Sequence, residues 1–171
     1  IVAAKITEAD YERSTAEYLR EPRLGRLKIV QGWDPHLARA LREGAEGRPA
    51  GRNRCGVTSG PMSFALFQYI HLLGAAAEGN WEEVESAQRA VTALFQAMQD
   101  DPAKFANLQR AKFLMGLGQP ITAAVSREET NRVLAALRNL PRPEDRRRLA
   151  RSLDLMENGP AHEELAALAA G

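Results

Sequence analysis

Three short apolar runs stand out in the first third of the chain, at Ile1–Lys5, Leu27–Gln31 and Arg54–Thr58. The first two are rich in Ile and Val and show no clear alternation, which is typical of strands buried on both faces. Helical segments are expected between them, at Glu8–Arg20 and Pro35–Glu43. The order β-α-β-α-β predicts parallel strands joined by right-handed crossovers.

After the third strand the apolar positions recur at helical spacing. We therefore expect a C-terminal part made of helices alone, at Pro61–Ala77, Asn80–Gln99, Asp101–Leu117, Ser126–Leu140, Glu144–Glu157 and Ala161–Ala170. The Gly-, Arg- and Pro-rich segment Gly44–Arg54 carries few apolar residues and is predicted to be a mobile surface loop.

Composition excludes several classes of protein. The 171 residues carry 23 basic and 22 acidic side chains, a net charge of +1, so no broad basic field points to nucleic acid. No apolar run approaches the roughly 20 residues of a membrane span. Cys55 is the only cysteine and cannot form an internal disulfide, which suits a reducing, cytoplasmic location. His36, His71 and His162 lack metal-ligand spacing, so no metal is expected.

The residue most suited to chemistry is Lys5, directly after four apolar residues. A lysine at the C-terminal end of a buried strand loses hydration, which frees its amine to attack a carbonyl group. Alternatively, Lys5 only marks the point where the strand meets solvent. The chain also begins directly on this strand, so we expect a preceding segment to belong to the same fold.

Small and polar residues follow the other two strands. Gly32, Trp33 and Asp34 come after the second strand, where glycine admits a ligand and the carboxylate could accept a substrate hydroxyl. Thr58 and Ser59 follow the third strand and could bind a carboxylate next to a helix N-terminus. The alternatives are structural: Asp34 as a helix cap, Trp33 as a packing residue, and Ser59 as the cap of the next helix.

In this order the segments resemble the dihydrodipicolinate synthase/N-acetylneuraminate lyase family. Lys5 and Thr7, followed by Asp10, are similar to its Lys-x-Thr/Ser-x-x-Asp stretch. Gly32–Asp34 and Gly56–Ser59 are similar to its Gly-x-Asp and Gly-x-x-Ser stretches. The resemblance implies an α/β fold, a (β/α)₈ TIM barrel of which this chain holds strands 6 to 8 and the C-terminal helical appendage.

The resemblance also implies a division into a barrel half at 1–79, a three-helix region at 80–140 and a helical extension at 141–171. Several departures from the family pattern stand beside it. Ile6 and Glu8-Ala9 replace the acidic residue and the glycine that are common after the lysine in many members. Pro35 follows Asp34 where the sialic-acid lyases carry an acidic residue. The first five strands, with their carboxylate-binding turn and proton-relaying tyrosine, lie outside the chain.

The function implied is a Schiff-base-forming lyase or aldolase acting on a small-molecule 2-oxo acid. Lys5 would be the nucleophile, and the substrate-binding residues would be Thr7, Gly32, Trp33, Asp34, Thr58 and Ser59. The resemblance implies no cofactor, no nucleic acid and no membrane partner. It does imply a homo-oligomer, commonly a tetramer. We expect the isolated fragment to be inactive. The alternatives are a Schiff-base dehydratase of a 2-keto-3-deoxy sugar acid, or a non-catalytic helical interaction module with a barrel remnant.

Overall fold

The computed structural model describes residues 1–49, 52–63, 65–99, 140 and 142–153. The chain divides into two compact units. The first comprises Ile1–Ser59 and His71–Gln88, and the second comprises Gly60–Ile70 and Arg89–Gly171. The first unit holds the strands and every predicted site residue.

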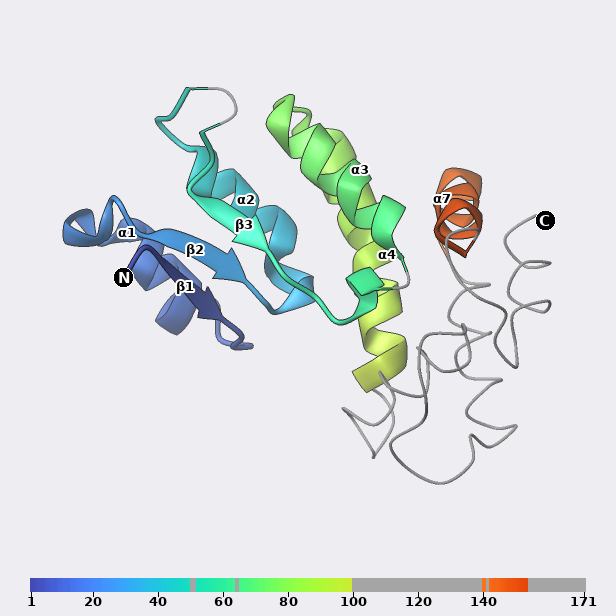
Figure 1. The fold of residues 1–171 in the computed structure, drawn as a ribbon, viewed down its shortest axis with the longest axis horizontal. Helices are drawn as coiled ribbons and strands as arrows, with labels where there is room; N and C mark the ends of the chain where they lie inside the picture. Colours follow the sequence, from blue (N-terminus) through green and yellow to red (C-terminus); the bar gives the residue numbers. More distant parts are fainter. Residues whose placement is uncertain (50–51, 64, 100–139, 141, 154–171) are drawn as a thin grey trace. The chain divides into compact units, whose positions relative to one another are not determined.

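A three-stranded parallel sheet organises the first unit (Figure 1). Its strands are β1 (Ala3–Ile6), β2 (Lys28–Gln31) and β3 (Cys55–Val57), hydrogen-bonded in the order β1-β2-β3. Lys5 pairs with Val30, and Val30 pairs with Gly56. The predicted strands are therefore present and parallel, although each is shorter than its apolar run.

The predicted (β/α)₈ barrel is wrong. Closing a barrel requires every strand to pair on both sides. In the described part of the chain β1 and β3 each pair with β2 alone, which leaves an open sheet. The expectation that the first strand is buried on both faces is also wrong, because β1 is an edge strand with Ala3 and Lys5 exposed. An apolar run without alternation therefore did not distinguish a strand buried on both faces from an exposed edge strand.

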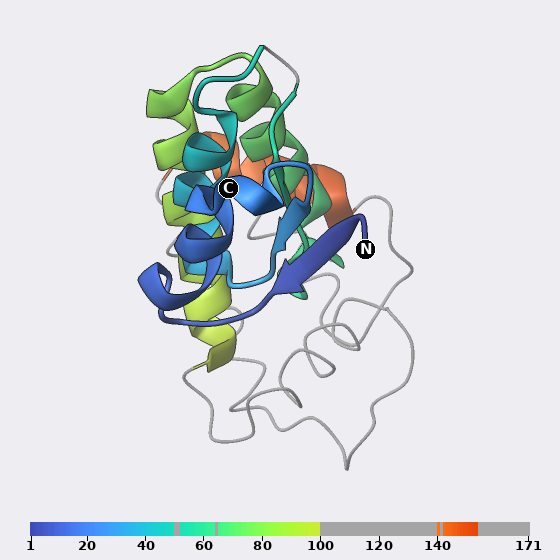
Figure 2. The ribbon, with the colours of Figure 1, turned by 90° about the vertical axis from the view of Figure 1, so that its left-hand side faces the viewer.

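Two helical connections cover one face of the sheet. The turn η1 (Glu12–Ala16), α1 (Glu17–Arg20) and η2 (Pro22–Leu24) link β1 to β2. The turn η3 (Asp34–His36) and α2 (Leu37–Ala45) link β2 to β3. Figure 2 shows α1 and α2 on the same side of the strands. This is the covered face.

The core lies beneath this covered face. Ile29 of β2 and Leu37 and Leu41 of α2 are almost fully buried. Gln31 is buried among them, and its Oε1 accepts a hydrogen bond of 3.0 Å from Thr15 Oγ1. Because side chains alternate along a strand, Ile29 and Gln31 face α2 whereas Lys5, Lys28 and Val30 lie on the opposite face. We call this second surface the open face.

An exposed ion-pair network joins η1, α1 and α2 at the surface of the first unit. Arg20 contacts Glu12 at 2.8 Å, and Arg39 contacts Glu43 at 2.9 Å and also Glu12. Exposed pairs of this kind contribute little to stability, because solvent screens their charges. The Arg39 guanidinium also stacks 4.1 Å from the ring centre of buried Tyr11. Burial and the nearby Glu43 carboxylate raise the pKa of Tyr11 above its ordinary range.

The remaining described helices are η4 (Pro61–Ser63), α3 (Leu66–Ala77), α4 (Trp81–Gln99) and α7 (Pro143–Leu153). Asn80 caps α4 as predicted, because its Oδ1 accepts a bond from Glu83 N at 3.2 Å. The helices predicted over 101–117, 126–139 and 161–170 lie outside the described residues.

The guanidinium of Arg54 anchors the N-terminal end of the sheet. Arg54 is only 5% exposed, although the sequence placed it in a mobile loop. Its nitrogens donate to the carbonyls of Tyr18 and Leu19 at the end of α1, at 2.7 and 2.6 Å. They also donate to Leu24 and Leu27 O, at 2.7 and 3.0 Å. Burial lowers the pKa of Arg54, and the four carbonyls compensate by satisfying the cation.

Replacing Arg54 tests this anchor. We expect Arg54→Met to lower the free energy of unfolding by at least about 2 kcal/mol, because buried carbonyls lose their donors. Urea denaturation followed by circular dichroism measures the loss. Exposed Arg52 is the matched control, and Arg52→Met should change stability by less than about 0.5 kcal/mol. Equal effects of the two substitutions would contradict the anchoring role.

Candidate functional site

The predicted site residues lie at the C-terminal edge of the sheet. Two backbone hydrogen bonds beyond the strands hold this edge together. Gly32 N donates to Ile6 O at 2.7 Å, and Thr58 N donates to Gln31 O at 2.9 Å. Lys5, Gly32 and Thr58 are therefore carried by three adjacent backbone segments, as the parallel order of the strands requires.

Gly32 brings β1 and β2 into unusually close contact. A Cβ atom added at Gly32 would lie 2.3 Å from Thr7 Oγ1, 3.0 Å from Lys5 Cε and 3.2 Å from Ile6 O. The space that a side chain would occupy is thus filled by Lys5 and Thr7. A glycine is needed here for the close approach of β1 to β2, whereas the sequence predicted that it admits a ligand.

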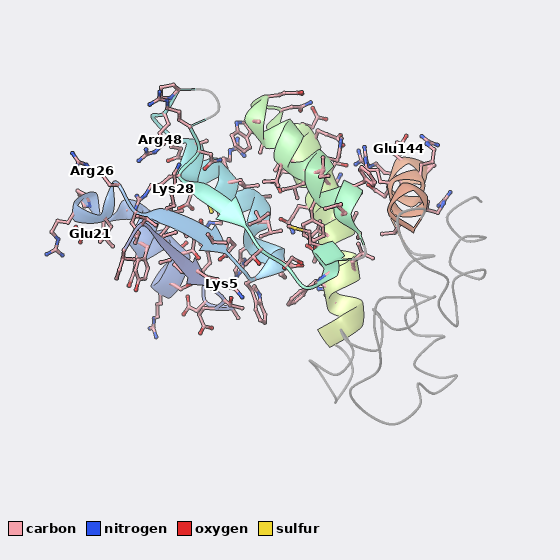
Figure 3. The ribbon with its side chains drawn as sticks, in the orientation of Figure 1. Lys5, Glu21, Arg26, Lys28, Arg48 and Glu144 are labelled. Carbon is pink, nitrogen blue, oxygen red and sulfur yellow. The ribbon has the colours of Figure 1, made fainter. Side chains whose placement is uncertain are left out.

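The Lys5 side chain is exposed on the open face. Figure 3 labels it at the C-terminal end of β1, with Lys28 near the start of β2. The sequence argument relied on burial to free the amine, and the described residues do not provide that burial. Thr7 is also exposed, whereas Gly32, Trp33, Thr58 and Ser59 are half-buried.

Asp34 occupies a different environment from Lys5. Asp34 is only 1% exposed, and its Oδ2 accepts a hydrogen bond of 2.5 Å from Ser59 Oγ. Asp34 is the first residue of η3, and Trp33 occupies the N-cap position of that turn. The Asp34 carboxylate links the segment after β2 to the segment after β3.

Gln88 is a positioning residue that sequence reasoning missed. From α4, its Nε2 donates to Asp34 O at 2.8 Å and its Oε1 accepts from Ala38 N at 2.7 Å. It thereby satisfies one of the backbone donors left free at the start of α2. Nothing in the local sequence signals this contact, because a glutamine among the apolar positions of a helix has no distinctive pattern.

The basic run in α7 does not form a free cationic face. Asp145 is 1% exposed in the second unit, and its carboxylate contacts Arg148 at 2.9 Å and Arg142 at 3.3 Å. Arg142, directly before α7, and Arg148, within it, are therefore paired with a buried acid. Arg147 contacts Glu144 at 3.7 Å.

No protein-family model and no curated protein matches the sequence of this chain. Among the described residues there is no cluster of three or more His, Cys, Asp or Glu side chains that could hold a metal ion. None of the described helices is both long enough and apolar enough to cross a membrane.

Substituting Gly32 tests the close contact with Lys5 and Thr7. We expect Gly32→Ala to lower the free energy of unfolding by about 1–3 kcal/mol, because the new methyl overlaps Thr7 and lies against Ile6 O. The control is Gly56→Ala in β3, where an added Cβ meets nothing within 4 Å. In the double variant Thr7→Ala/Gly32→Ala we expect part of the loss to be recovered, as measured by a double-mutant cycle in urea.

Cys55 gives a prediction about pH. Burial raises the pKa of this thiol from 9.0 to about 12, so the folded protein keeps a proton that the unfolded chain releases above pH 9. Because the thiol binds its proton more tightly in the folded state, ionisation favours the unfolded chain, and the free energy of unfolding falls as pH rises through this window. We expect Cys55→Ala to flatten the decline of unfolding free energy between pH 9 and 11, measured by urea titration. Parallel slopes for the two proteins would contradict it.

Proposed function

We propose that Lys5 forms a Schiff base with a 2-oxo acid and that the protein acts as a lyase or aldolase. The observation that carries this proposal is the packing of Lys5 Cε and Thr7 Oγ1 into the space left by Gly32, at the C-terminal edge of a parallel sheet. Ligands of α/β sheets commonly bind outside this edge. The sequence resemblance through Lys5, Thr7, Gly32 and Asp34 supports the same chemistry.

In this mechanism the neutral amine of Lys5 attacks the 2-oxo carbon, and water leaves to give an iminium. The iminium withdraws electrons from the adjacent bond, so a C–C bond breaks with its electron pair forming an enamine. Reprotonation of the enamine and hydrolysis then release the product and restore the lysine. The reverse sequence forms the C–C bond. No metal or organic cofactor is required by these steps.

The other residues of the edge have supporting roles in this proposal. Thr7 holds the Lys5 stem on one side, and Thr58 and Ser59 offer hydroxyls to the substrate carboxylate. Asp34 fixes Ser59 through the 2.5 Å hydrogen bond and is too buried to contact a substrate hydroxyl directly. Trp33 borders the same edge. A dehydratase would use the same iminium but expel a hydroxyl group, so product analysis separates the two reactions.

Borohydride trapping tests the nucleophile. We expect pyruvate and borohydride to add a stable mass to Lys5, identified by peptide mass spectrometry, and Lys5→Arg to abolish the adduct. Lys28→Arg is the matched control, because Lys28 is exposed on the same open face of the sheet. An adduct on Lys28, or no adduct with any 2-oxo acid of a panel, would contradict the proposal that Lys5 is the nucleophile.

A non-catalytic interaction module is the second candidate. The exposure of Lys5 and the apolar edge at Ile1 and Val2, both exposed, favour it. An edge strand presents unpaired backbone groups that can add a further strand. This candidate predicts no trapped adduct, together with a partner-dependent protection of the β1 amides from hydrogen exchange. The trapping and exchange experiments therefore distinguish the two functions.

A further inference from the structure

A cavity of about 470 Å³ lies within the first unit, away from the proposed nucleophile. Asn53 and Cys55, at the start of β3, form part of its wall, whereas Lys5 lies at the opposite, C-terminal end of the parallel strands. Its volume falls within the range of about 300–1,000 Å³ typical of small-molecule sites. Most of the lining is apolar, from Leu41, Ala45, Pro49, Leu73, Ala76, Ala77 and Trp81.

The walls of this cavity are fixed by hydrogen bonds and close packing. Asn53 Nδ2 donates to Leu41 O at 2.7 Å, and Asn53 Oδ1 accepts from Cys55 N at 2.8 Å. These bonds clamp α2 against the start of β3. A Cβ added at Gly44 would lie 2.7 Å from Cys55 Cβ, so the two backbones are already in contact. A site that is formed before binding avoids the entropic cost of ordering its walls.

The two charged lining residues of the cavity, Arg48 and Glu78, have opposite signs. The Arg42 guanidinium lies 5.8 Å from the ring centre of Trp81 and adds a cation beside the lining. Figure 3 labels Arg48 on the segment after α2. Asn53 uses its amide in the clamp, which leaves Arg48 as the polar contact suited to an anion.

We propose that this cavity binds an aliphatic molecule that carries one carboxylate, with its chain against α2 and α3 and its carboxylate at Arg48. The aliphatic lining of Leu and Ala residues favours a chain, because the only aromatic ring in the lining, Trp81, already has Arg42 against it. Two arginines, Arg48 in the lining and Arg42 beside Trp81, stand against the single carboxylate of Glu78, which favours an anion over a cation. This site is separate from the Lys5 edge and does not depend on Schiff-base chemistry.

The chain supplies two natural reporters for a binding experiment. Trp81 lines the cavity and is one of two tryptophans, so the Trp33→Phe variant keeps Trp81 as its single tryptophan. Cys55 also lines the cavity and is the only thiol, so its alkylation rate reports occupancy. We would titrate decanoate, decanol and decylamine into this variant below their micelle concentrations. Decanoate is expected to change Trp81 fluorescence and slow Cys55 alkylation, at least fivefold more tightly than decanol and with decylamine weakest.

Three variants make the outcome specific. Arg48→Ala should reduce decanoate affinity about fivefold and leave decanol affinity unchanged, whereas Arg26→Ala, at an exposed arginine outside the lining, should change neither. Ala77→Phe should abolish the binding of both decanoate and decanol, because the new ring fills the cavity from its exposed rim. If the Ala77→Phe variant does not fold, Ala45→Leu takes its place. No response of Trp81 to any probe overturns the proposal, as does decylamine binding as tightly as decanoate. Unaltered decanoate binding in both cavity-filling variants overturns it as well.

Discussion

The buried guanidinium of Arg54 is the constraint on which the first unit depends. A cation taken out of water requires hydrogen-bond acceptors, and Arg54 finds them in four carbonyls from three segments that precede β2. Because Arg54 directly precedes β3, the same residue sets where the third strand begins relative to the first crossover. The register at the other end of the sheet, where Lys5, Gly32 and Thr58 lie, follows from that starting point.

The parts of the fold that could be predicted from the sequence are those with a local cause. Apolar runs of four or five residues located the three strands, and Asn80 with Glu83 located the start of α4. The barrel could not be derived this way, because strand closure is a non-local property that no short run contains. The motif resemblance supplied it instead, and the described strands form an open sheet.

The candidate site shows the same division. The sequence predicted that Gly32 admits a ligand, whereas Lys5 and Thr7 of the neighbouring segment fill the space beside it. The burial of Asp34 and Arg54 was not predictable, because each depends on partners at least 25 residues away or on several carbonyls at once. The exposure of Lys5 agrees with the alternative offered from the sequence, in which Lys5 marks the point where the strand meets solvent. The pattern alone could not decide between burial and exposure, because edge and central strands share one composition when both are short and apolar.

The contact made by Gln88 has a kinetic consequence. It ties the start of α2 to a residue 50 positions later, at Ala38, and the preceding turn to one 54 positions later, at Asp34. The entropy of closing such a loop is lost before the hydrogen bonds form. The first turn of α2 is therefore expected to complete only once α4 is in place, even though α2 itself is a local element. The strands also pair across 25 or more residues, from Ala3 to Lys28 and from Ile29 to Cys55, so the sheet and the start of α2 both depend on non-local contacts.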